Sequence, residues 1–185
     1  MGRNGYPTGA KLSRKKPGPC VERTALDGDA RAPHTPYVEW PRPPYLVSDD
    51  PARLQLAVVH QALARSYWAA GIPRELVARS IANSLCLGLY REPGARQVGF
   101  ARAITDRATF AYVSDVFVLE EERAQGLGRF LVECLQAHPE LQGLRRWMLV
   151  TRDAQALYAR LGWRVVARPE EVMEIVLPDP YRAAP

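Results

Sequence analysis

The chain has 185 residues, of which 47% are hydrophobic and 24% are charged, and its formal net charge at pH 7 is +5. This is the composition of one ordinary globular domain. No apolar run approaches the ~18 residues of a membrane-spanning helix, so we expect no membrane partner. The three cysteines and three histidines are scattered, which argues against a disulfide framework and a metal site and favours a reducing, cytoplasmic setting.

Residues 1–44 differ in composition from the rest of the chain. They hold eight of the sixteen prolines, all three lysines and a net charge of +4. We interpret them as a Pro-rich basic N-terminal extension and place the folded domain at residues 45–185. Such segments are usually disordered or loosely draped. The basic run at 14–16 is short, which argues against contact with nucleic acid. We therefore expect deletion of residues 1–40 to leave stability nearly unchanged.

The first half of the domain predicts a strand, two helices and an antiparallel meander. Residues 45–47 form a short strand candidate, and the acids before Pro51 indicate a helix that runs to about Ser66. A second helix begins after Ile72. Apolar stretches separated by turn residues then predict three antiparallel strands. These strands are expected at residues 85–90, 97–105 and 110–118.

The third of these strands leads into a turn with two glycines. Three acids and the run 123–126 follow it, and a helix then begins with apolar residues at spacings 0, 3, 4, 7 and 8 from Leu127. The free amides of a helix's first turn attract anions, and Gly126 and Gly128 remove side chains that would keep a phosphate away. Neither the Rossmann pattern nor the phosphate loop of nucleotide triphosphatases fits, because a third glycine and a Gly-Lys-Ser/Thr are missing.

The rest of the chain predicts short alternating elements. The turn helix should end near Pro139, and residues 147–150 should form a strand. A short helix at 153–161 is closed by Gly162, which suits a left-handed cap. Two last strands are expected at 163–167 and 172–177.

Two motifs resemble the GNAT superfamily, the acetyl-CoA-dependent N-acyltransferases. The run Arg123-x-x-Gly126-x-Gly128 is similar to the family's pyrophosphate-binding motif, and residues 151–163 (TRDAQALYARLGW) are similar to its downstream Asn-x-x-Ala-x-x-Leu-Tyr-x-x-x-Gly-Phe segment. The resemblance covers about residues 45–177. It implies an α/β (α+β) fold, the GNAT fold, in which a mixed, mostly antiparallel sheet carries helices on both faces.

The resemblance also implies acetyl-CoA as cosubstrate, with no metal. The turn would hold its pyrophosphate, the backbone of the preceding strand would pair with the pantetheine, and Asp153 stands where the family has an Asn that reaches it. The family usually has Gly at Ala124, where a methyl group fits if φ is negative. The expected cofactor-binding residues are Phe117, Val118, Arg123, Ala124, Gln125, Gly126, Leu127, Gly128, Arg129 and Asp153.

Three residues are candidates for catalysis. Tyr158 takes the place of the family's general acid, because a phenol can protonate the leaving thiolate. The carboxylates that act as base in some relatives are absent, so Ser114 could only relay a proton through water. Asp115 either binds the acceptor's positive charge or makes a core hydrogen bond, and Asp153 could merely cap its helix.

The acceptor site should lie under the first two helices and their connection. Tyr67, Trp68 and Tyr112 are its expected residues, with simple packing as the alternative. The partners are then acetyl-CoA and the primary amine of a small molecule or a protein, while a homodimer stays open. A non-catalytic acyl-CoA-binding module with a basic arm is the alternative function.

Overall fold

The computed structural model describes residues 21–23, 37–177 and 181. Its seven strands form one open sheet in chain order. All neighbouring strands are antiparallel except β6 and β7, which are parallel. The strands are β1 (Val21–Arg23), β2 (Tyr37–Arg42), β3 (Tyr45–Ser48), β4 (Leu85–Arg91), β5 (Arg96–Thr105), β6 (Phe110–Val118) and β7 (Arg146–Met148).

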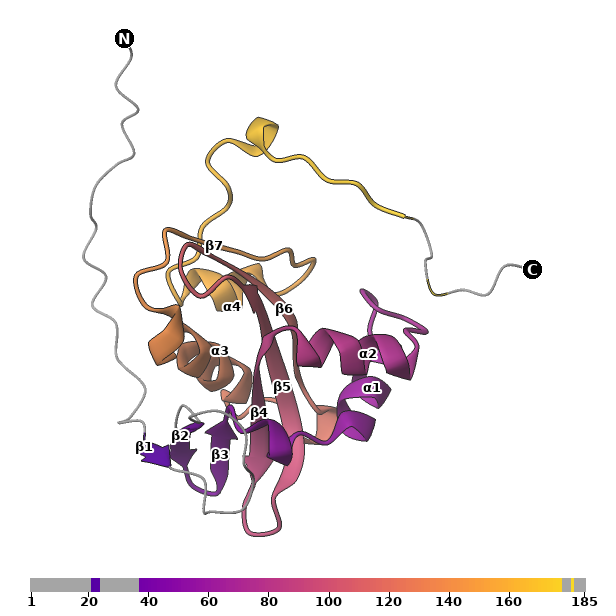
Figure 1. Ribbon diagram of the computed structural model, residues 1–185, viewed down its shortest axis with the longest axis vertical. Helices are drawn as coiled ribbons and strands as arrows, with labels where there is room; N and C mark the ends of the chain where they lie inside the picture. The colour runs from indigo at the N-terminus through magenta and orange to yellow at the C-terminus, as the bar shows by residue number, and fades with distance from the viewer. Residues whose placement is uncertain (1–20, 24–36, 178–180, 182–185) are drawn as a thin grey trace, which may run out of the picture.

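Helices cover both faces of this sheet, as predicted (Figure 1). α1 (Leu56–Ala64) and α2 (Arg74–Ala82) pack on one face through a cluster that includes Cys86 and Phe100, with Phe117 against it. α3 (Leu127–Ala137) packs on the other face through the apolar stripe that its spacing predicts. α4 (Gln155–Ala159) lies beside it. No helix among the described residues is long and apolar enough to cross a bilayer.

Short 3₁₀ turns link several of these elements, and they are η1 (Pro51–Arg53), η2 (Glu120–Glu122), η3 (Pro139–Leu141) and η4 (Pro169–Glu171). The first of them corrects one prediction. The acidic cap and proline expected to start the first helix start η1 instead, with Asp50 accepting from the Ala52 amide at 2.9 Å. α1 begins only at Leu56, without a side-chain cap.

The boundary predicted at residue 44 falls too late. Residues 37–42 form β2, which pairs with β3 and buries Val38 and Trp40 to 4% and 2% exposure. Proline-rich composition concealed this strand. Pro41 is compatible with it because β1 pairs only with residues 37–39, so the edge of β2 that the Pro41 nitrogen faces has no partner strand among the described residues. The basic run at 14–16 lies outside the described residues.

The two last strands are also wrong. Apart from η4, residues 163–177 have no regular secondary structure, and Met173 and Ile175 are 95% and 97% exposed. Alternating apolar residues gave this segment strand propensity, but a strand also needs a partner edge. The neighbouring edge strand, β7, is only three residues long.

Candidate functional site

The glycine-bearing turn lies between η2 and α3, at the end of β6. Gly126 has a φ of +72°, a left-handed conformation that favours glycine. The first α3 hydrogen bond runs from the Phe130 amide to the Gly126 carbonyl at 3.1 Å. The three amides between them therefore have no intrahelical acceptor. A Cβ on Gly128 would meet Val118 Cγ2 at 3.9 Å as its nearest described neighbour. The turn thus has the free amides and the room that a phosphate needs.

Ala124 also adopts a left-handed conformation, with a φ of +62°. The condition under which a methyl group fits here, a negative φ, is therefore not met, and such a conformation costs an L-residue about 1–2 kcal/mol. Arg42 of β2 holds the turn from outside, donating to the carbonyls of Gln125 at 3.0 Å and Gly126 at 3.3 Å. Contacts from the sheet therefore stabilise a turn whose own backbone is strained.

The two arginine side chains predicted for cofactor binding have protein partners. Arg123 Nε donates to the Val118 carbonyl at 3.1 Å. Arg129 Nε donates to Glu133 at 2.8 Å, one helical turn further along α3. The Arg129 side chain is 49% exposed, so the remaining N–H groups of its guanidinium and its backbone amide are both accessible at the turn.

The edge of β6 next to the turn is open. Only the first three residues of β6 pair with β7, and Asp115 lies at a bulge with a φ of +54°. The Leu119 amide donates to the Val98 carbonyl on β5 at 2.8 Å. Successive amides of a strand point to opposite edges, so the Val118 amide faces the opening toward β7. A ligand in that opening would meet an unpaired backbone donor.

Tyr158 lies on α4 and is linked to β7 through Trp163. Its ring packs edge-to-face on Trp163 at 5.7 Å, and Trp163 packs on Trp147 of β7 at 6.1 Å between ring centroids. Burial raises the pKa of Tyr158 to about 12, and the nearby Tyr67 adds to the shift. The phenol is therefore protonated at neutral pH, as a general acid must be.

Asp153 does not cap α4. The N-cap residue is Ala154, whose own side chain makes no capping bond, and the Ala154 amide donates to Thr151 Oγ1 at 3.1 Å. Asp153 is exposed, so its carboxylate is accessible to solvent at the start of α4.

Asp115 is held by protein donors. Arg102 contacts its Oδ2 through Nε at 2.8 Å and Nη2 at 2.7 Å, and Trp68 Nε1 donates to Oδ1 at 3.2 Å. Arg102 Nη2 also lies 3.4 Å from Ser114 Oγ. The Asp115 side chain is only 9% exposed. Its oxygens are occupied, which favours the core hydrogen bond over a role as base.

Two aromatic side chains form an exposed edge beside this pair. Tyr67 and Trp68, in the connection between α1 and α2, are 45% and 44% exposed and pack edge-to-face at 4.9 Å. The Arg152 guanidinium lies 3.7 Å from the Tyr67 ring centroid, and the Arg152 amide donates to Tyr67 Oη at 3.2 Å. Tyr112 pairs with the last residue of β7 where the opening begins. The three predicted acceptor residues therefore come from elements that flank the opening.

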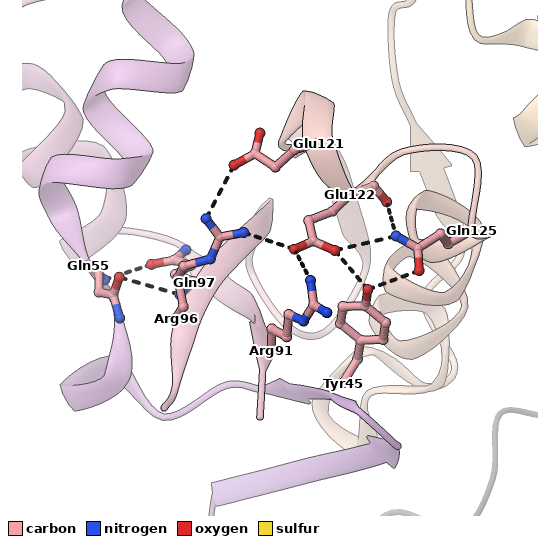
Figure 2. Close-up of polar contacts among 8 residues, drawn as sticks. All are labelled: Tyr45, Gln55, Arg91, Arg96, Gln97, Glu121, Glu122 and Gln125. Carbon is pink, nitrogen blue, oxygen red and sulfur yellow. Dashed lines mark hydrogen bonds and ion pairs between the residues drawn. The ribbon is translucent and has the colours of Figure 1, made fainter. Parts of the chain in front are cut away.

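Sequence reasoning missed the charged residues that support these groups. Glu122 is 1% exposed below the turn (Figure 2), yet it stands in a run of three acids that reads as solvent-facing. Arg42 lies 84 residues from the carbonyl of Gly126 that it contacts. Arg102 lies within β5, among the buried residues of that strand. No local signal could have connected Glu122 and Arg42 to the turn, or Arg102 to Asp115.

The fold and the site together define a class of protein. A sheet that opens between two parallel strands, a glycine turn with free amides after β6 and a buried, protonated tyrosine on α4 fit an enzyme that transfers an acyl group. Residues 82–165 match the family model described as an acetyltransferase (GNAT) domain. The chain belongs to the GNAT family of acetyltransferases, which confirms the resemblance seen in its motifs.

Individual relatives agree with this assignment. A Gibberella zeae protein assigned as an acetyltransferase is 36% identical over 142 residues, which is 65% of this chain and 79% of that protein. A crystal structure assigned to a GNAT acetyltransferase of Xanthomonas campestris is 45% identical, with a TM-score of 0.73, and covers 76% of this chain and 99% of that one. Mouse N-alpha-acetyltransferase 80 is 38% identical over 93 residues, which is 46% of this chain but 30% of that protein.

Proposed function

We propose that this acetyltransferase moves an acetyl group from acetyl-CoA to a primary amine of a small molecule or a protein. The observation that supports the proposal is the opening between β6 and β7: the glycine turn follows β6, the Val118 amide faces away from β5, and Tyr158 packs through Trp163 on Trp147 of β7. GNAT proteins use acetyl-CoA, and a Clostridium acetobutylicum neighbour of similar fold, with 14% identity and a TM-score of 0.54, is described with acetyl-CoA.

The residues divide the work as follows. The amides of residues 127–129 would bind the pyrophosphate, and the open space at Gly128 lets it approach. The Val118 amide would donate to the thioester carbonyl oxygen, where negative charge develops. Bound acetyl-CoA supplies the activated acyl group. Tyr158 Oη would give its proton to the sulfur as the C–S bond breaks and the C–N bond forms.

The amine must lose a proton without a free carboxylate beside it. Arg102 and Trp68 occupy the oxygens of Asp115, so the amine enters neutral or passes its proton to water, with Ser114 as a relay. Tyr67 and Tyr112 would flank the acceptor. The missing base is also what favours the second candidate, a non-catalytic acyl-CoA-binding module. The scattered cysteines support a cytoplasmic setting.

Tyr158→Phe tests the enzymatic proposal. It keeps the ring and its packing, and loss of a general acid should lower thiol release with the best amine of a panel by ~10²–10⁴-fold. The acetyl-CoA dissociation constant should change little. Tyr90→Phe is the matched control, because Tyr90 is also a buried tyrosine whose hydroxyl finds no partner among the described residues.

Two outcomes contradict the proposal. Full activity of Tyr158→Phe would make Tyr158 a packing residue. A parent protein that binds acetyl-CoA but releases no thiol with any amine would support the non-catalytic module.

Gly128→Val tests the cofactor site separately. A Cβ at Gly128 meets only Val118 Cγ2, at 3.9 Å, among the described residues, so we expect the protein to fold, with the valine in the space that a phosphate needs. Calorimetry should show acetyl-CoA binding abolished. Undiminished binding by the folded variant would refute the assignment of the turn.

A further inference from the structure

Glu122 is a buried carboxylate with four side-chain contacts (Figure 2). Its oxygens accept from Tyr45 Oη at 2.7 Å, Arg96 at 2.8 Å, Arg91 at 3.0 Å and Gln125 Nε2 at 3.3 Å. These donors come from β3, β4, β5 and the glycine turn. One side chain thus connects three strands of the sheet to the segment proposed to bind pyrophosphate.

Burial of this carboxylate needs a compensating benefit. An ionised group is costly to remove from water unless charges and hydrogen bonds satisfy it. The Tyr45 hydrogen bond, followed by those from Arg91 and Arg96, outweighs burial and lowers the pKa of Glu122 to about 2. Glu122 is therefore ionised at neutral pH. Its neighbour Glu121 is 55% exposed and contacts Arg96 at 3.3 Å, so the same acid one residue away does not need such a setting.

The contacts of Glu122 act where the backbone is strained. Ala124, two residues later, has a left-handed φ, a state that persists only when its surroundings impose it. Tyr45 Oη lies 2.7 Å from Glu122 and 3.0 Å from Gln125 Oε1, on either side of Ala124. Arg42 holds the next two carbonyls independently. The turn is thus fixed from the sheet at both of its ends.

We propose that Glu122 is a positioning residue that holds the 123–128 turn in its anion-binding conformation. This inference rests on the proposed function of the turn. A turn that is already ordered does not have to be ordered when the ligand binds, so its affinity is higher.

Electrostatics alone predicts the opposite effect of removing the Glu122 charge on acetyl-CoA binding. Glu122 is an anion near the proposed site of another anion, and it neutralises Arg91 and Arg96. If its charge were what mattered, Glu122→Gln would strengthen acetyl-CoA binding. If positioning matters, the same change weakens binding, because the glutamine cannot satisfy both arginines and Tyr45.

The experiment compares Glu122→Gln with Glu121→Gln in the full chain. We expect the dissociation constant and KM for acetyl-CoA to rise about tenfold in Glu122→Gln, with kcat changed less than about twofold. Glu121→Gln makes the same charge change at an exposed position and should stay within about twofold of the parent. A lower kcat with unchanged KM, or unchanged or tighter binding by a folded Glu122→Gln, would overturn the inference.

Two further measurements keep the test decisive. If Glu122→Gln does not fold, Tyr45→Phe removes one donor and leaves the charge, and it should weaken binding by a smaller factor in the same direction. If the parent does not bind acetyl-CoA, the proposed function fails, but hydrogen exchange still tests whether Glu122 holds the turn. Amides of residues 123–128 should exchange faster in Glu122→Gln than in Glu121→Gln, and equal rates would contradict the proposal that Glu122 holds the turn.

Discussion

Replacing Trp40 by alanine tests whether β2 belongs to the folded core. Trp40 is 2% exposed and packs in the cluster that α3 covers, with its ring 5.9 Å from that of His138. Removing a buried tryptophan side chain typically costs about 3–5 kcal/mol. For a chain of this size each kcal/mol lowers Tm by about 2–4 °C, so the expected loss is roughly 6–20 °C.

Trp68→Ala is the matched control, since it removes the same side chain from a position that is 44% exposed. Its cost should stay near ~1 kcal/mol, including the loss of its hydrogen bond to Asp115. Urea unfolding followed by circular dichroism gives both free energies of unfolding without relying on tryptophan fluorescence. Equal losses in the two variants, or a Trp40→Ala loss below about 1 kcal/mol, would refute the packing of β2 and restore the view of residues 1–44 as a detachable extension.

Three shorter predictions follow from buried charges and thiols. Burial raises the pKa of Cys86 to about 12 and also raises the pKa of Cys134. A Cys20→Ser variant, which keeps only these two thiols, should therefore gain no iodoacetamide adduct at pH 8 when folded and two adducts when unfolded. Rapid labelling of the folded variant would contradict this. Asp115→Asn leaves Arg102 without its buried partner and should lower the free energy of unfolding by about 3 kcal/mol, and a loss under ~1 kcal/mol would show that the pair is solvated. The pKa of Glu122 falls from an ordinary 4.5 to about 2 on folding, so its contribution to the free energy of unfolding is fully present above pH 4.5 and is lost as the pH falls toward 2. Between these pH values the Tm of Glu122→Gln should therefore depend less on pH than the Tm of the parent. Parallel curves of Tm against pH would contradict this.

The elements that sequence reasoning placed well are those whose local pattern decides their structure. β6 and α3 follow from an apolar run and from a stripe at helical spacing, and the strands expected at 85–90 and 97–105 are found as β4 and β5. Gly162 ends its helix with a φ of +89°, as its position predicted. Where propensity and tertiary partner disagree, prediction failed. β2 was missed although it has partners, and residues 172–177 were expected to pair although the structure gives them none.

The same division holds for the site. The turn and Tyr158 could be found because their motifs are contiguous in sequence. The groups that hold them could not, because Tyr45 and Arg91 reach Glu122 across 77 and 31 residues. The sequence could not decide the role of Asp115, because its partner Arg102 lies on the neighbouring strand and no residue near Asp115 predicts that contact. Side chains that act through a fold, rather than through a motif, become visible only when the strands are paired.

The opening between β6 and β7 affects the stability of the free protein and its dependence on ligand. Backbone groups on that edge of β6 beyond Tyr112 have no strand to protect them, so in the free protein they exchange their hydrogens with solvent readily. A ligand that lies along this edge takes up those hydrogen bonds in place of a strand. Binding at the proposed site would then complete the sheet, and each rise in ligand concentration would make the whole domain harder to unfold.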